Sequence, residues 1–118
     1  MVTVLNHEFH QKGWGHEEWI YNGEYCGKLL VFESEKKCSW HFHKIKDETF
    51  YVLSGSFLIK HSNQDDLGLA DQTILIQGQA LRIPPLLRHQ IIALQASTML
   101  EISTHHNESD SYRLTRGD

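Results

Sequence analysis

Residues 41–48 read HFHKIKDE, and six residues separate Glu48 from Gly55. Side chains two positions apart on a β-strand point to the same face, so His41 and His43 would present their imidazoles side by side. The polar run 44–47 is suited to turn the chain and bring Glu48 back beside them at the start of the next strand. Glycine at position 55 suits a turn, because a positive φ costs it little. This stretch predicts two strands that carry a pair of histidines and a carboxylate.

A second segment completes the pattern about forty residues later. Five residues separate Gly78 from Pro84, and four more separate Pro84 from His89. Proline breaks the ladder of a sheet, so His89 would begin a new strand. Three imidazoles and one carboxylate from three strands would form a mixed nitrogen and oxygen site for a divalent first-row metal, with positions left for water or substrate. A lone His-x-His pair also fits a surface or cross-strand pair, but the full spacing favours the metal site.

The rest of the chain predicts β-structure in one domain. Short runs rich in β-branched and aromatic residues alternate with turn signals, and no segment has the apolar spacing of a three-turn helix. Residues 1–23 are expected to form an arm with one short strand, residues 24–104 a barrel, and residues 105–118 a tail. The expected strands are residues 24–32, 38–44, 49–60, 73–76, 80–83, 89–94 and 98–104, with a loop at 62–66.

Composition narrows the classes of partner. With 118 residues, 40% of them hydrophobic, the chain is long enough to bury one core. Its formal charge of −4 argues against sequence-independent binding of nucleic acid, which needs a basic face. No apolar run approaches the roughly 18 to 20 residues that span a bilayer, and no signal peptide is visible. We therefore expect a cytoplasmic protein without a nucleic-acid or membrane partner.

The nine histidines are unusually many for this length, and imidazole is a common metal ligand. His105 and His106 near the end of the chain are expected to be solvated. For His61, a place in the core, a place at the surface and a role as a proton relay all remain open. Cys26 and Cys38 are too few for a disulfide framework. They are interpreted as small buried strand residues, with a single bridge as the alternative.

The spacing of the histidines, glutamate, glycines and proline matches the pattern of the cupin superfamily, and the chain resembles a single cupin domain over about residues 24–104. The resemblance implies an all-β fold, a small double-stranded β-helix or jelly-roll barrel. It also implies one divalent transition metal ion inside that barrel: zinc, manganese, iron, cobalt or nickel. The implied ligands are His41, His43, Glu48 and His89.

Two positions depart from the cupin pattern. Glu35 stands where the first motif begins with glycine, and Leu86 stands where the second motif has a glycine after its proline. Both glycines serve turns in the family. Their loss therefore puts the geometry of the loops in doubt rather than the ligands.

Four short sequence motifs make the resemblance more specific. They are similar to the cupin portion of type II mannose-6-phosphate isomerases and to related small sugar isomerases of the D-lyxose isomerase kind. The motifs are WGHEEW at residues 14–19, GKLL at 27–30, EIST at 101–104 and DSYR at 110–113. This resemblance implies a metal-dependent aldose–ketose isomerase that acts on a sugar or a sugar phosphate.

Such an isomerase needs a base to move a proton between C1 and C2, while the metal stabilises the charge of an enediol-like intermediate. Glu101 is the candidate base, because an isolated carboxylate in an apolar strand needs a reason; an outward, solvated side chain is the alternative. Lys28 and Arg113 are candidates for contacting sugar hydroxyls or a phosphate. The alternative is that each is an ordinary surface charge. Arg88 ranks lower, since strand alternation turns it away from His89.

Three function classes remain open at this stage. The first is the sugar or sugar-phosphate isomerase, and the second is a cupin dioxygenase that uses the same four metal ligands. The third is a non-catalytic sugar-binding cupin that lacks a competent base. A homodimer is expected in each case, because edge strands need covering and the N-terminal arm is rich in tryptophan and histidine.

Overall fold

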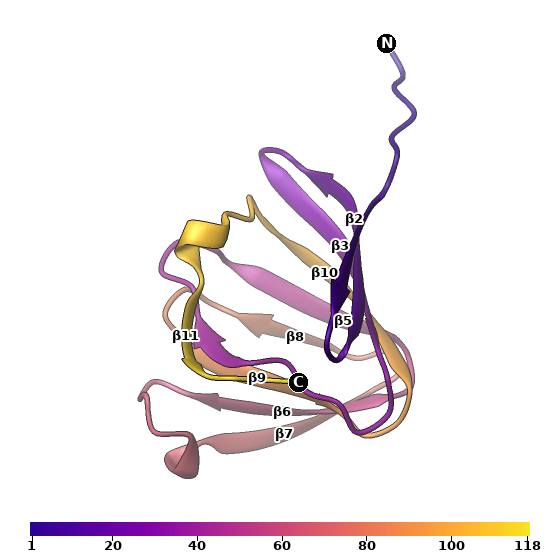
Figure 1. Ribbon diagram of the computed structural model, residues 1–118. Coiled ribbons are helices and arrows are strands. Elements are labelled where there is room, and N and C mark those ends of the chain that lie inside the picture. Colours follow the sequence, from indigo (N-terminus) through magenta and orange to yellow (C-terminus); the bar gives the residue numbers. More distant parts are fainter.

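Two antiparallel sheets pack face to face in the computed structural model, which describes residues 1–118 (Figure 1). The first has six strands in the order β1-β2-β3-β10-β5-β8, and the second has five in the order β11-β4-β9-β6-β7. The strands are β1 (Glu8–Lys12), β2 (Gly15–Asn22), β3 (Tyr25–Phe32), β4 (Trp40–Phe42), β5 (Glu48–Ser54), β6 (Ser56–Ser62), β7 (Asp71–Ile76), β8 (Ala80–Ile83), β9 (Arg88–Ala93), β10 (Ser97–Thr104) and β11 (Tyr112–Thr115). This is the all-β jelly-roll architecture predicted from the sequence.

The inner faces of the sheets form one hydrophobic core. In β3 every second residue from Cys26 to Phe32 is buried, which is the two-residue period of a strand with one face inward. Phe32 stacks on Trp14 with ring centroids 4.0 Å apart and meets Phe57 edge-on at 5.3 Å. Each such buried side chain contributes roughly 1.5–3 kcal/mol to folding. Because the core joins both sheets, it fixes the strands that carry the site.

The glycine turn predicted at position 55 is confirmed, and Gly78 also lies in a turn. Gly55 and Gly78 have φ angles of 83° and 86°, a region that favours glycine. A side chain at position 55 would also collide with Ser97. Glu35 and Leu86, where the cupin pattern has glycine, have φ angles of 66° and 75°. The loops therefore keep a glycine-like conformation although neither residue is glycine.

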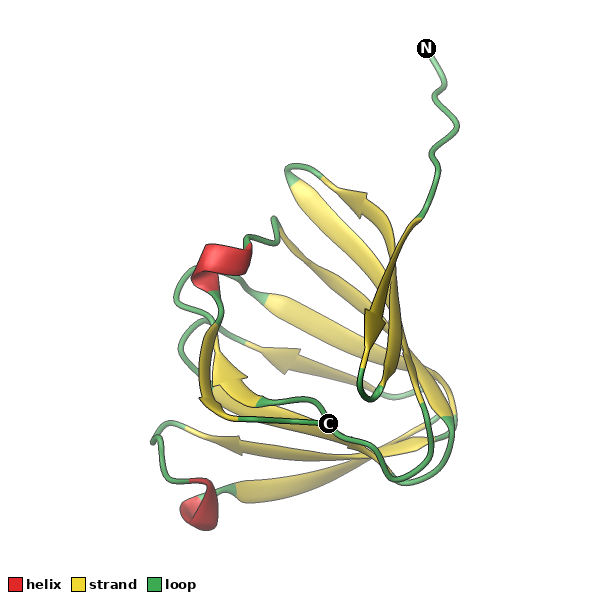
Figure 2. Cartoon of the chain, in the orientation of Figure 1, coloured by secondary structure: helices red, strands yellow, loops and turns green.

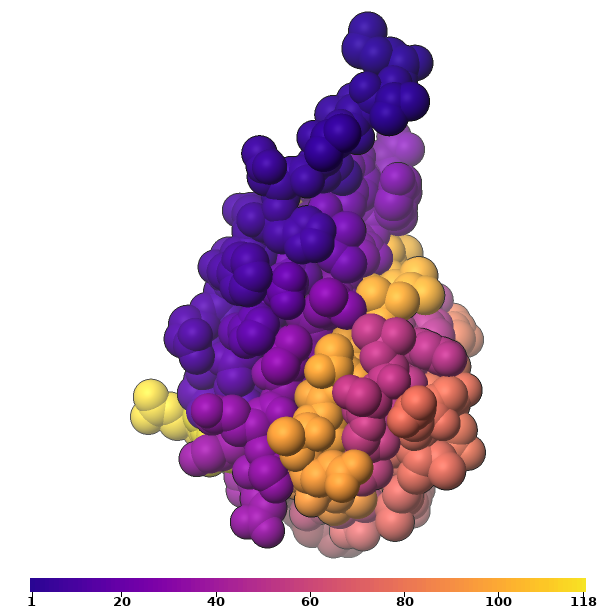
Figure 3. Space-filling view, turned by 90° about the vertical axis from the view of Figure 1, so that its right-hand side faces the viewer, coloured from indigo at the N-terminus to yellow at the C-terminus, as the bar shows by residue number.

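The two ends of the chain contain more structure than the sequence predicted. The first 23 residues were expected to contain one short strand, but they contain β1 and β2, which extend the six-stranded sheet beyond β3. Polar residues lie on both faces of this hairpin, so its sequence shows little hydrophobic alternation. The tail forms β11, which pairs with β4. Residues 1–6 project away from the body of the molecule (Figure 3).

The helices are two 3-10 turns, η1 (Leu67–Leu69) and η2 (Glu108–Asp110), both within connecting segments (Figure 2). Neither has the length and apolar character of a membrane-spanning helix. The absence of longer helices agrees with the sequence, which has no helical spacing of apolar residues.

Candidate metal centre

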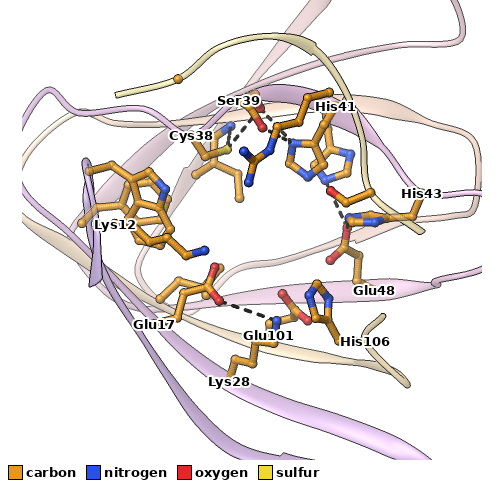
Figure 4. Close-up of a pocket in the computed structure, with 18 of the residues that line it drawn as sticks. Lys12, Glu17, Lys28, Cys38, Ser39, His41, His43, Glu48, Glu101 and His106 are labelled. Carbon is orange, nitrogen blue, oxygen red and sulfur yellow. Dashed lines mark hydrogen bonds and ion pairs between the residues drawn. The ribbon is translucent and has the colours of Figure 1, made fainter. Parts of the chain in front are cut away.

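The strands bring the three predicted histidine ligands together. His41 on β4 lies directly opposite His89 on the neighbouring strand β9, and His43 follows the end of β4. The ligand atoms of these three residues, which we call the histidine cluster, lie within 4.8 Å of one another. Three histidines at this separation could hold a metal ion. His41 and His43 lie with Glu48 on one side of the cavity (Figure 4).

Backbone carbonyls fix the tautomer of every imidazole in the cluster. Nδ1 of His41 lies 2.9 Å from the oxygen of Ser39, Nδ1 of His43 lies 2.9 Å from that of Asp110, and Nδ1 of His89 lies 3.0 Å from that of Leu87. A carbonyl oxygen only accepts hydrogen bonds, so Nδ1 carries the proton in each ring. Each neutral ring therefore keeps a lone pair on Nε2, the atom left free to bind a metal.

Glu48, the first residue of β5, adds an oxygen to these nitrogens. Its Oε2 lies 3.1 Å from Nε2 of His89 and 3.4 Å from Nε2 of His43. Neither Oε2 of Glu48 nor Nε2 of His89 has a hydrogen-bond partner, although both are buried. Buried acceptors that face one another are unfavourable unless a cation lies between them. The residues present therefore fit a divalent ion bound by nitrogen and oxygen.

The environment keeps these groups in the states that bind metal. Burial lowers the pKa of His41 well below its ordinary value, and the neighbouring His89 and His43 lower it further. Burial also lowers the pKa of His43. For Glu48, burial favours the neutral acid, but the neighbouring Lys46 ammonium lowers the pKa of the carboxyl group and favours the ionised form. Neutral imidazoles and an ionised carboxylate are the forms that coordinate metal ions.

A second group of polar residues, the charged cluster, consists of Lys46, Glu101 and His106. The Lys46 ammonium is buried, 2.6 Å from Oε2 of Glu101, 2.9 Å from Nδ1 of His106 and 3.4 Å from Oε1 of Glu48. Burial disfavours its charge, but Glu101 and Glu48 outweigh that effect and raise the pKa of Lys46. Ser103 donates a 2.8 Å hydrogen bond to Oε2 of Glu101, and no side chain of the protein bonds its Oε1.

Many solved structures share this architecture, and three of them illustrate it. The capsular polysaccharide assembling protein CapF from Staphylococcus aureus superposes with a TM-score of 0.80 at 16% identity, over 95% of this chain and 35% of CapF. Oxalate decarboxylase from Bacillus subtilis has a TM-score of 0.77 at 16% identity, over 97% of this chain and 33% of that one. An RmlC-like cupin from Shewanella frigidimarina has a TM-score of 0.73 at 17% identity, over 87% of each chain. The chain has the cupin fold.

The cupin resemblance seen in the sequence is thus confirmed at the level of the fold. The chain spans about a third of the length of CapF and of oxalate decarboxylase, and nearly the full length of the Shewanella cupin. No protein-family model and no curated protein matches the sequence.

The cupin barrel brings the other candidate residues to one cavity of about 400 Å³, which Lys28, Glu101 and Arg113 line together with the histidine cluster. Glu101 is buried and faces this cavity, so the alternative of an outward, solvated side chain is wrong. Lys28 is only 1% exposed, and its ammonium lies 3.6 Å from Glu17 and 4.2 Å from the ring of Trp19. Arg113 is exposed at the rim on β11.

One histidine of the tail was predicted wrongly. His106 is not solvated: it lines the cavity, accepts from Lys46 and donates from Nε2 to Glu108 over 3.0 Å. Its tautomer is therefore opposite to that of the metal-facing histidines. Sixty residues separate His106 from Lys46 in the sequence, so no local spacing could have indicated the contact. His105 is exposed, as predicted.

The remaining histidine and cysteine predictions are resolved. His61 lies directly opposite His89 on β6, but its Nε2 lies 2.8 Å from Oγ1 of Thr73, so a cross-strand partner occupies it. Cys26 and Cys38 are both free and buried, so no bridge forms. Arg88 pairs with Asp65 and covers the ring of Phe42, away from the cavity, as strand alternation predicted.

Sequence reasoning missed Asp110 as a structural residue. Its buried carboxylate accepts hydrogen bonds from the backbone N–H groups of Lys44, Ile45 and Lys46, at 2.9 to 3.2 Å. Its carbonyl oxygen accepts from Nδ1 of His43. One residue of η2 therefore holds both a histidine ligand and the turn that carries Lys46.

Proposed function

We propose that this cupin binds one divalent first-row transition metal ion and interconverts an aldose and a ketose, either a free sugar or a sugar phosphate. The proposed ligands are His41, His43, Glu48 and His89. The observation that carries the proposal is the position of Glu101, whose carboxylate is buried at the same cavity with one oxygen unengaged. A metal site and a base facing one cavity are the two components that such an isomerase requires.

When bound, the metal ion would supply Lewis-acid stabilisation of the negative charge that develops on the substrate oxygens. Oε1 of Glu101 takes a proton from the carbon next to the carbonyl and returns it to the carbonyl carbon, while the hydroxyl proton passes between the two neighbouring substrate oxygens. Ser103 and Lys46 hold Oε2 of the same carboxylate, so the base presents a single oxygen to the sugar. Lys28 and Arg113 contact the hydroxyl groups or a phosphate of the substrate.

The test begins with elemental analysis of the purified protein, followed by incubation with a panel of aldoses and aldose phosphates. We expect about one metal ion per chain and ketose formation without consumption of oxygen. Glu101→Gln should lower the rate by about 10²- to 10⁴-fold, as the loss of a general base does, at unchanged metal content. Glu33→Gln, an exposed change, is the matched control.

Ketose formation by the Glu101→Gln variant at the wild-type rate would exclude Glu101 as the base. Activity that survives complete removal of the metal by a chelator would exclude the metal mechanism. Oxygen uptake with enediol substrates in place of ketose formation would favour the dioxygenase.

We also propose that the protein forms a homodimer. Val2 and Val4 in the projecting N-terminal residues are more than 90% and about 90% exposed, and such apolar side chains are suited to packing on a second subunit. Sedimentation equilibrium of the protein with and without residues 1–6 tests this, since only the longer form should dimerise. The cytoplasmic location predicted from the sequence stays a prediction.

A further inference from the structure

Lys46 is a deeply buried charged group of which the proposed mechanism uses only the contact with Glu101. It belongs to the turn between β4 and β5, and only 3% of the residue is exposed. A lysine in a four-residue polar turn would ordinarily extend into solvent, and its ammonium loses several kcal/mol of hydration when buried. Its position therefore calls for specific compensation by its neighbours.

That compensation comes from two carboxylates with different tasks. The ammonium lies 3.4 Å from Oε1 of Glu48, the proposed metal ligand, and 2.6 Å from Oε2 of Glu101, the proposed base. The opposite oxygen of Glu48, Oε2, is the one that faces His43 and His89. In Glu101, Ser103 donates to the same oxygen that Lys46 contacts, which leaves Oε1 free.

We propose that Lys46 is a positioning residue that occupies one oxygen in each of two buried carboxylates. The other oxygen of each is thereby left for a single task, metal binding in Glu48 and proton transfer in Glu101. By occupying Oε1 of Glu48, it restricts that residue to metal binding through Oε2 alone. By occupying Oε2 of Glu101 together with Ser103, it leaves Oε1 as the single proton acceptor. The first half rests only on the metal site, and the second half rests on the proposed isomerase function.

Two further contacts hold the ammonium in this place. His106 accepts from Lys46 on Nδ1, and its ring meets Trp19 edge-on with centroids 5.2 Å apart. The backbone N–H of Lys46 donates to Oδ2 of Asp110 over 3.0 Å. Both ends of the residue are therefore fixed, and the ammonium is held between Glu101, Glu48 and His106.

The test uses the full chain loaded with cobalt(II), whose visible absorption bands weaken as its coordination number rises. Lys46→Met keeps an unbranched side chain of similar length but removes the charge, so both oxygens of Glu48 become available to the ion. We expect one cobalt ion per chain and a loss of band intensity relative to wild type. Lys44→Met, two residues away and exposed over the ring of Tyr112, is the matched control and should keep the wild-type spectrum.

A wild-type spectrum in the Lys46→Met variant would overturn the proposal. If that variant fails to fold because Glu101 is left without a cation, the double variant Lys46→Met/Glu101→Gln removes the excess negative charge and must show the same loss of intensity. Metal content and the spectrum are both independent of turnover. An altered spectrum in the variant, together with a wild type that has no isomerase activity, would therefore count against the isomerase function and not against Lys46. Failure of wild type to bind cobalt would remove the metal site on which the proposal depends.

Discussion

The histidine cluster and the charged cluster face the same cavity, but they are held in place by different means. In the histidine cluster, backbone carbonyls orient the rings, and two of these carbonyls belong to the residue two positions earlier in the chain: Ser39 for His41 and Leu87 for His89. In the charged cluster, side chains hold one another, and the contacts of Lys46 reach Glu101 and His106 in distant segments. Two rings of the histidine cluster therefore depend on local backbone geometry and the third, His43, depends on the distant carbonyl of Asp110, whereas the charged cluster depends on tertiary ion pairs.

The two clusters therefore hold their side chains ready for their tasks in two different ways. The backbone carbonyls leave the histidines neutral with a free lone pair on Nε2, which is the state that a metal requires. The ion pairs keep the Lys46 ammonium charged in a buried site where it would not be stable alone. Changes in the first cluster should therefore act on metal binding, whereas changes in the second should act on proton transfer and on stability.

The largest expected effect is the loss of metal binding in His89→Ala. This substitution removes a nitrogen from the middle of the cluster, so metal affinity should fall by more than the roughly 10- to 100-fold that the loss of an outer hydrogen-bond partner causes. Isothermal titration calorimetry of the metal-free protein measures the change.

The control for this prediction is His61→Ala, since His61 lies opposite His89 on the neighbouring strand but has Thr73 as its partner. Metal affinity in that variant should equal that of wild type. An equal loss in both variants would contradict the separation between the histidine cluster and its neighbours.

The second effect concerns Asp110, the residue that connects the two clusters. In Asp110→Ala, the backbone N–H groups of three turn residues lose the buried carboxylate that accepts from them. Each such loss costs about 1–3 kcal/mol when water cannot enter, and with partial relaxation we expect unfolding free energy to fall by about 2 kcal/mol. Urea denaturation measures it, with Asp65→Ala as the control, because Asp65 pairs with Arg88 at the surface.

Metal affinity should also fall in Asp110→Ala, although its carbonyl still accepts from His43, because the turn that leads to Glu48 loosens. If stability falls and metal affinity does not, the two clusters are held independently of each other.

The same difference explains how much of the molecule the sequence predicts. His41, His43, Glu48 and His89 follow from strand alternation and from glycine and proline positions, all of which are short-range signals. Lys46, His106 and Asp110 lack such a signal, because their roles depend on contacts between residues about 60 apart or more. The β1–β2 hairpin was missed for a related reason, since its side chains pair with one another rather than alternating between core and solvent.

A smaller effect is the pH dependence that comes from Cys38, which lines the cavity beside the histidine cluster. Burial raises the pKa of its thiol from 9.0 to about 12. Above pH 9 the unfolded thiol loses its proton while the folded one keeps it, so stability is intact below pH 9 and falls as the pH rises toward 12. The expected slope is about 1.4 kcal/mol per pH unit.

Urea denaturation of wild type and of Cys38→Ala at pH 8, 9.5 and 10.5 isolates this contribution, because other alkaline titrations occur in both proteins. The stability difference between them should shift in favour of the alanine variant as the pH rises. A difference that is constant across this range would show that the thiol is not held in its neutral form.

The smallest effect concerns the two loops in which a residue other than glycine, Glu35 or Leu86, adopts a left-handed backbone conformation. A left-handed conformation costs a residue with a side chain roughly 1–2 kcal/mol, whereas glycine adopts it freely but has more entropy to lose on folding. Glu35→Gly should therefore raise the unfolding free energy by about 0.5–1 kcal/mol. Glu33→Gly, two residues earlier and without a positive φ, should lower it instead.

Leu86→Gly tests whether the strained loop itself positions His43, because the backbone N–H of Leu86 donates to the carbonyl oxygen of His43 over 2.7 Å. If the local backbone alone orients the histidines, relief of strain at Leu86 should raise stability and leave metal affinity unchanged. A gain in stability with a fall in metal affinity would mean that the strained loop itself holds His43 in its binding position. In that case the departure from glycine at this position contributes to the site, and the histidine cluster would depend on tertiary strain as well as on local carbonyls.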